Sequence, residues 1–164
     1  MGNVLNILHG PCEVFINGTS VGYTTGGVRI RKSVEQLDVE ADQVVGVIVK
    51  KTSMERMFVA TTLLESTLEN LMKAMSEPAS NTAGSGDLEY GSASPEVQEY
   101  LLTLTGAGPN GKTRRYTLYR AAVSGDREFT FGERGAVTSI PIEWECMKDP
   151  TRGNKFGYHE DLTT

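Results

Sequence analysis

Residues 139–146 read SIPIEWEC, and apolar side chains occupy every even-numbered position of this segment. A period of two places Ile140, Ile142 and Trp144 on one face of a β-strand. Pro141 has no N–H to donate to a neighbouring strand, so part of this strand is expected to behave like a sheet edge. The segment therefore predicts a half-buried strand in a protein that is mainly β.

The same alternation recurs along most of the chain, and about seven or eight strands are expected. Asn17-Gly18 is a two-residue turn signal that follows an alternating run. At Leu37 and Val39 the apolar positions change from even to odd numbers, which predicts a bulge or bend near residues 32–35. Residues 50–53 read KKTS and predict a turn between two further strands.

One segment has helical periodicity instead. Residues 62–65 read TLLE, which is the spacing of a capping box, and Pro78 ends the pattern. The apolar positions between them fall on one helical face: Leu64, Leu68, Leu71, Met72 and Met75. We predict one helix over about residues 62–76, packed against the sheet.

These patterns predict one domain over residues 1–164, an antiparallel β-sandwich or barrel with a single flanking α-helix. Residues 78–95 are rich in Ser, Ala and Gly and predict a flexible loop. Neither side of this loop makes a complete core alone, so no domain boundary is expected there. Residues 148–164 are polar without periodicity and predict a polar C-terminal tail.

Composition excludes several classes of function. The chain has 16 Lys and Arg against 21 Asp and Glu, a net charge of −5, which argues against a dedicated nucleic-acid binder. No apolar run approaches the ~18 residues of a membrane span. The first residues lack the basic and apolar parts of a signal peptide, so we expect the chain to be made in the cytoplasm without export by a signal peptide. Cys12 and Cys146 are therefore expected to be small buried hydrophobes.

Motifs for chemistry are few. Residues 106–113 read GAGPNGKT and fit the P-loop pattern, but the aromatic and β-branched residues that follow predict a strand where a P-loop needs a helix. We therefore predict a hairpin loop there. Nothing positions a catalytic device around His9 or His159, and metal-ligand spacing is absent. We expect no enzyme activity, no cofactor and no metal.

Two charged series stand out. Asp38, Glu40 and Asp42 share one face of a strand, where they would either hold a cation or form a solvated acidic face. Arg29 and Arg31 form a basic face earlier in the same β region. Opposite charges at the two ends of one β region suit pairing between neighbouring copies of the chain.

In their order along the chain, three segments resemble the major tail tube proteins of tailed bacteriophages. These segments are residues 10–28, which include the GYTTGGV run, residues 39–43, which read VEADQ, and residues 63–71, which read LLESTLENL. The likeness covers about the first 75 residues. The family is related in fold to the tubes of contractile injection and type VI secretion systems.

The resemblance implies hexameric rings that stack into a hollow tube, with hairpin strands of six copies closing one inner barrel. Such a tube conducts the genome from the virion tail into the host without sequence-specific binding. Six copies at −5 each give −30, and an acidic lumen would let DNA slide. The implied partners are tape measure, terminator and sheath proteins, with no membrane.

The expected lumen-facing or inter-subunit residues follow from these charges and from the resemblance: Asp38, Glu40, Asp42, Arg29, Arg31, Lys50 and Lys51. By resemblance, residues 44–56 reach the next ring, while the alternative is a hairpin within the chain. Two other functions stay open. One is a tube of a contractile injection or secretion particle, and the other is a small β-barrel that binds a ligand between its sheet and helix.

Overall fold

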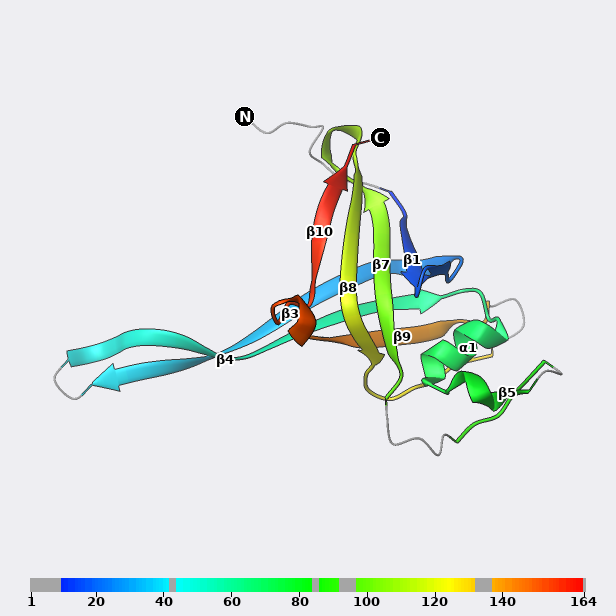
Figure 1. The fold of residues 1–164 in the computed structure, drawn as a ribbon, viewed down its shortest axis with the longest axis horizontal. Helices are drawn as coiled ribbons and strands as arrows, with labels where there is room; N and C mark the ends of the chain where they lie inside the picture. The colour runs from blue at the N-terminus through cyan, green and yellow to red at the C-terminus, as the bar shows by residue number, and fades with distance from the viewer. Residues whose placement is uncertain (1–9, 42–43, 84–85, 92–96, 132–136, 164) are drawn as a thin grey trace.

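Antiparallel strands make up most of this protein, as Figure 1 shows. The computed structural model describes residues 10–41, 44–83, 86–91, 97–131 and 137–163. The strands are β1 (Cys12–Ile16), β2 (Thr19–Ser20), β3 (Thr24–Ala41), β4 (Val44–Leu63), β5 (Thr82–Ala83), β6 (Asp87–Leu88), β7 (Glu99–Ala107), β8 (Thr113–Val123), β9 (Ile140–Met147) and β10 (Gly157–Leu162). The helical elements are α1 (Leu68–Met75) and the single 3-10 turns η2 (Ala79–Asn81), η3 (Pro109–Gly111) and η4 (Pro150–Arg152).

The main sheet has eight strands and forks at β8. Its order is β2-β1-β7-β8-β9-β4-β3, and β10 also pairs with β8. The fork arises because β8 pairs with β10 over residues 113–118 and with β9 over residues 120–123. In Figure 1, β7, β8 and β10 run across β3, β4 and β9, so the sheet folds over itself in two crossing layers. It is not closed into a barrel, because β3 and β10 each have one neighbouring strand among the described residues.

The core lies between these two layers. The predicted alternation of β9 is confirmed, since its even-numbered side chains from Ile140 to Cys146 are buried. Trp144 is fully buried beside the equally buried Val59, its cross-strand partner on β4. The largest fully buried side chains are Trp144, Ile16, Leu63, Leu102, Leu104, Ile140, Val14, Val21 and Val59.

The single α-helix begins later than predicted. Thr67 is the N-cap, and its side chain accepts a hydrogen bond of 3.2 Å from the backbone N–H of Asn70. The helix ends at Ser76, whose left-handed backbone forms the C-cap. Residues 62–63 belong to β4 instead, because Leu63 pairs with Ile140 of β9 and its side chain fills the core. Packing of the sheet therefore outweighs the local capping-box signal.

Residues 148–164, predicted as a polar tail without periodicity, contain the strand β10 over residues 157–162. This strand pairs with β8, and Asp161 accepts two hydrogen bonds, of 2.6 and 2.9 Å, from the guanidinium of Arg114. Gly157 lies so close to Thr117 that a Cβ would overlap the Thr117 carbonyl oxygen. The strand was missed because its pairing rests on polar side chains and a glycine, which leave no apolar period.

Short elements occupy part of the predicted loop over residues 78–95. η2 leads into β5, which pairs with β6. The Glu77 carboxylate accepts a hydrogen bond of 2.7 Å from the side-chain amide of Asn81. Residues 84–85 and 92–96 of this predicted loop lie outside the described residues.

Two predicted turns are confirmed. Asn17 and Gly18 both have positive φ, 51° and 83°, and connect β1 with β2 as a two-residue hairpin loop. Residues 106–113 run from the end of β7 through η3 into β8. A strand therefore follows the P-loop-like sequence, as the aromatic and β-branched residues predicted.

Candidate functional site

A long hairpin of β3 and β4 projects from the crossing layers, on the left in Figure 1. The last pair between β4 and β9 is Met57 with Cys146, and beyond it β4 pairs with β3 alone. We name residues 33–56 the arm. Its strands extend for roughly 30 Å at about 3.3 Å per residue. The arm is a two-stranded ribbon with two open edges, among the residues that the structure describes.

The turn predicted at residues 50–53 is wrong, because these residues lie inside β4. Lys50 pairs with Asp38 and Lys51 with Leu37, so β3 and β4 form a hairpin within the chain. An irregularity opposite Glu35 and Gln36 leaves Ser53 unpaired in β4, and its hydroxyl donates a hydrogen bond of 3.1 Å to the Glu35 carbonyl. The polar KKTS run therefore forms part of a solvent-exposed strand with a β-bulge. This bulge is in β4, and β3 has no extra residue over 32–35, where the sequence predicted a bulge or bend.

The ribbon carries apolar side chains on one side near the body and on both sides further out. We call its two sides the even side and the odd side, after the numbers of the β3 residues that project from each. Near the body the even side is apolar, since Ile30 lies opposite the buried Val59. In the outer arm the even side still exposes Val34 and Val47, and the odd side exposes apolar side chains as well. Its exposed apolar side chains are Leu37, Val39, Val49 and Met54.

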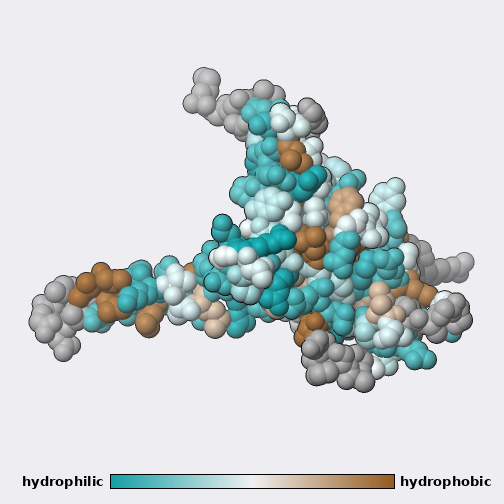
Figure 2. Space-filling view, viewed as in Figure 1, coloured by the Kyte–Doolittle hydropathy of each residue, from teal (hydrophilic) through white to brown (hydrophobic). Residues whose placement is uncertain are grey.

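This arrangement explains why the apolar positions of the sequence change from even to odd numbers at Leu37 and Val39. β3 continues without an extra residue between Arg29 and Val39, so its alternation is not reset. Leu37 and Val39 therefore point away from the side that the core covers. Figure 2 shows apolar side chains gathered near the outer end of the arm. Leu37 is 59% exposed, which is unusual for a leucine in the middle of a long strand.

The predicted site residues divide between the two sides of the ribbon. Asp38 and Glu40 share the even side, where Lys50 Nζ lies 3.0 Å from Asp38 Oδ1. Lys51 lies on the odd side, opposite Leu37. Asp38 and Lys50, two of the predicted site residues, thus form an ion pair within the chain. Asp42 lies outside the described residues.

Arg29 and Arg31 project from the odd side where the arm leaves the body. The guanidinium carbon of Arg31 lies 4.3 Å from the centre of the Phe58 ring, and one of its nitrogens is 3.9 Å from a carboxylate oxygen of Glu143. Arg56 approaches Glu145 in the same way at 4.0 Å. This face therefore carries acids and bases side by side.

Glu55 fixes the base of the arm to the body. Its carboxylate oxygens lie 2.8 Å from Lys32 Nζ on β3 and 2.9 Å from Lys148 Nζ just after β9. Hydrogen bonds from Lys32, then from Lys148, lower the pKa of Glu55 to about 2. Sequence patterns gave no signal for this clamp, because the three residues come from separate segments.

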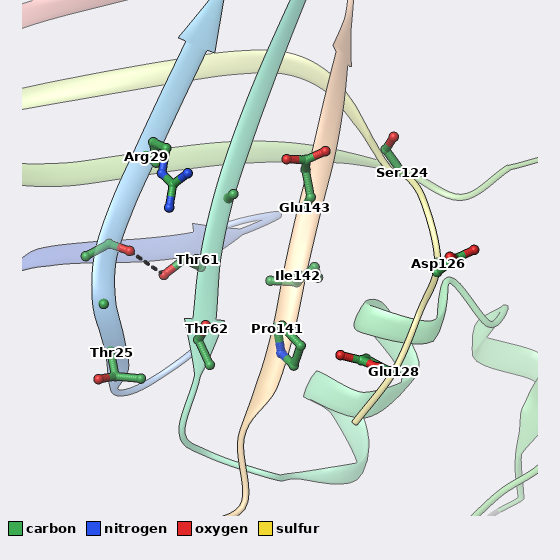
Figure 3. Close-up of a pocket in the computed structure, with 13 residues that line it drawn as sticks. Thr25, Arg29, Thr61, Thr62, Ser124, Asp126, Glu128, Pro141, Ile142 and Glu143 are labelled. Atoms are coloured by element: carbon green, nitrogen blue, oxygen red, sulfur yellow. Dashed lines mark hydrogen bonds between the residues drawn. The ribbon is translucent and has the colours of Figure 1, made fainter. Parts of the chain in front are cut away.

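A hollow of about 520 Å³ lies where the odd side meets the segment after β8, and Figure 3 shows it. Arg29, Asp126, Glu128 and Glu143 surround it, and the Thr61 hydroxyl donates a hydrogen bond of 3.1 Å to the Gly27 carbonyl. Neither histidine nor cysteine is among the described residues of its lining. The hollow is thus lined by charged side chains and by hydroxyl groups, among them that of Ser124.

The remaining candidate groups are scattered. Cys12 and Cys146 are free thiols, and Cys146 is buried as predicted, while Cys12 is only half-buried. Burial raises the pKa of Cys146 to about 12. His159 lies on β10, and its ring centre is 5.3 Å from that of Tyr116, while His9 lies outside the described residues. In the described part of the chain, no three acidic, histidine or cysteine side chains gather as a metal site.

The arm is therefore the candidate functional site. A lone two-stranded ribbon is marginally stable in water, and this one also exposes an apolar side and open edges. The fold is mainly β, and its arm exposes apolar side chains and strand edges that have no partner among the described residues. Comparison with known families finds no matching family model, and no curated protein matches the sequence. None of the described helices is long and apolar enough to span a membrane.

Proposed function

We propose that this protein is a structural, self-assembling protein, the tail tube protein of a tailed bacteriophage. In this proposal, copies of the chain form hexameric rings that stack into a hollow tube in the virion tail. The observation that carries the proposal is the arm, a ribbon with open edges and an exposed apolar side. The resemblance of residues 10–28, 39–43 and 63–71 supplies the particular class of assembly.

The open edges support association through strands. β3 pairs only with β4 along its whole length, so the N–H and C=O groups on its outer edge have no strand partner among the described residues. An edge of this length invites a strand from another molecule. Closing such edges between six copies would complete a barrel that one copy leaves open.

The charge of the chain supports a conduit for DNA. A duplex carries one negative charge per ~1.7 Å of its axis, so basic walls would hold it by releasing counterions. An assembly of chains with −5 each repels DNA overall. We propose that Glu40 faces the lumen, with Asp38 partly neutralised by Lys50. Tape measure, terminator and sheath proteins are the proposed partners, after synthesis in the host cytoplasm.

Sedimentation velocity over a range of concentrations, followed by negative-stain microscopy, tests the proposal. We expect rings at low concentration and tubes of uniform diameter with a central channel at high concentration. Fibrils without a channel would contradict a tube, since exposed edges also lead to amyloid-like stacking. A chain that stays monomeric at every concentration would refute self-assembly.

A gel-shift experiment at low salt tests the lumen. Assembled tubes are expected to leave duplex DNA unshifted, and Glu40→Lys tubes are expected to retain it. Retention of DNA by the unmodified tubes would contradict an acidic conduit.

A further inference from the structure

An apolar groove of about 310 Å³ lies on the even side of the ribbon, between the base of the arm and the strands β8 and β10. Ile30 and Met57 line it from the ribbon, and Leu118 and Phe156 line it from the body. Ile30 is 36% exposed, although its cross-strand partner Val59 is fully buried. The groove therefore leaves an apolar wall beside the core in contact with solvent.

The charged side chains at this groove are all basic. Lys32, Lys155 and His159 line it, and none of the described lining residues carries a carboxylate. The chain as a whole has the opposite balance, with 21 Asp and Glu against 16 Lys and Arg. Apolar pockets with a few polar groups are typical of small-molecule sites, where the polar groups orient the ligand. An apolar ligand with a negative charge suits this lining.

One of the three bases has no partner within the chain. Lys32 is partly neutralised, because its Nζ lies 2.8 Å from a carboxylate oxygen of Glu55. Lys155 has no ion pair in the described part of the chain, so its ammonium group is available to a ligand. The acids on the neighbouring segments already have basic partners: Glu55 with Lys32 and Lys148, Asp149 with Arg152, Glu160 with Arg115, and Asp161 with Arg114.

The size of the groove limits the ligand. Sites for small molecules measure about 300–1,000 Å³, and this groove lies at the small end of that range. One flexible hydrocarbon chain matches this space better than the two chains of a membrane lipid. The apolar side chains on both walls would cover such a chain and remove its surface from water.

We propose that this groove binds a free fatty carboxylate of medium chain length, about ten carbons. The hydrocarbon chain lies against Ile30, Met57, Leu118 and Phe156, and the carboxylate pairs with the ammonium group of Lys155. A charge-assisted hydrogen bond of this kind fixes the orientation of the ligand. This binding activity goes beyond the proposed self-assembly and does not depend on it.

Titration of the full chain with sodium decanoate, below the concentration at which decanoate forms micelles, tests the site. Carbon-13 NMR of the methionine methyl groups provides the readout. Met57 lines the groove, whereas Met54 is exposed on the odd side of the arm, three residues away. We expect the Met57 signal to shift to saturation and the Met54 signal to stay in place. Equal shifts of both signals would indicate unspecific binding to exposed apolar surface and would overturn the inference.

Two substitutions test the two parts of the site, and calorimetry measures the affinity of each variant for decanoate. Ile30→Asp places a carboxylate beside the hydrocarbon chain and is expected to weaken binding at least roughly tenfold. Val34→Asp makes the same change on the same side of β3, outside the groove, and is the matched control. Lys155→Gln is expected to weaken binding roughly fivefold at low salt, with Lys51→Gln on the arm as its control. Far-UV circular dichroism verifies that each variant is folded.

Two further probes separate the charge of the ligand from its chain. Decyltrimethylammonium has the same chain with a positive charge, and butyrate has the same charge with a short chain. Neither is expected to bind at concentrations where decanoate saturates the groove, and equal binding of the cation would contradict the role of Lys155. If decanoate does not bind and Ile30→Asp blocks self-assembly, a second copy covers the groove. This inference then fails, while the proposed function stands.

Discussion

Removing the outer arm is expected to abolish assembly and leave the body folded. The variant replaces residues 35–54 by Asn-Gly, so that Val34 and its cross-strand partner Glu55 are joined by a two-residue turn. It keeps the clamp of Glu55 with Lys32 and Lys148. Every described side chain that is removed is exposed, and the first fully buried residue of β4 is Val59.

The structure gives the expected magnitudes. Exposed surface side chains contribute little to the body, so we expect its unfolding free energy to change by less than about 1 kcal/mol, or about 4 °C in Tm. Four apolar side chains of the arm are about half exposed. Covering the exposed half contributes about 1 kcal/mol for each, about 4 kcal/mol for one arm, or about a thousandfold in affinity.

Calorimetry measures the stability of the body, and sedimentation velocity measures assembly. A companion variant keeps the length of the arm but changes its apolar side chains to threonine: Leu37→Thr, Val39→Thr, Val49→Thr and Met54→Thr. It separates loss of the apolar side from loss of the open edges. If the excised variant unfolds or still forms tubes, the arm is not a separate docking element and the reasoning is refuted.

Three further predictions concern the base of the arm and the body. The pKa of Glu55 is lowered to about 2, so its bonds to Lys32 and Lys148 stabilise the arm base above pH 4.5 and are lost as pH falls toward 2. The Glu55→Gln variant should therefore lose stability at pH 6 and show a flatter acid profile, and an unchanged profile would disprove the clamp. Gly157→Ala should lower the Tm by several degrees, because its Cβ would overlap the Thr117 carbonyl, and fast amide exchange confined to β10 would locate the damage. Burial raises the pKa of Cys146 to about 12, so this thiol should resist alkylation at pH 8 until the protein unfolds. Rapid labelling of Cys146 in the folded chain would contradict its burial.

Much of the β architecture could be predicted from the sequence because burial on one face leaves a period of two. Trp144 and its neighbours on β9 show this most clearly, and the Asn17-Gly18 turn needed only its backbone preference. The start of the helix could not be predicted, because Leu63 belongs to a strand only through its pairing with the distant residue Ile140. The boundary between β4 and the helix is therefore set by pairing between residues far apart in the sequence.

Polar strands were the main failure of sequence reasoning. β10 and the outer part of β4 have few buried side chains, so alternation carries no signal there. Of the candidate site, the charged positions Asp38 and Lys50 were predicted, but not their pairing at 3.0 Å. The reversal of parity at Leu37 was visible in the sequence, and its meaning depended on the continuous register of β3.

The fork at β8 has a consequence for the order of events during synthesis. The arm is a local hairpin, whereas β10, which pairs with one half of β8, begins about 100 residues further along the chain. At 5–20 residues per second, a ribosome takes about 5–20 s to cover that distance. During this interval a nascent chain has its arm but lacks the strand that completes the fork. We therefore expect the arm to emerge from the ribosome before the body can finish folding.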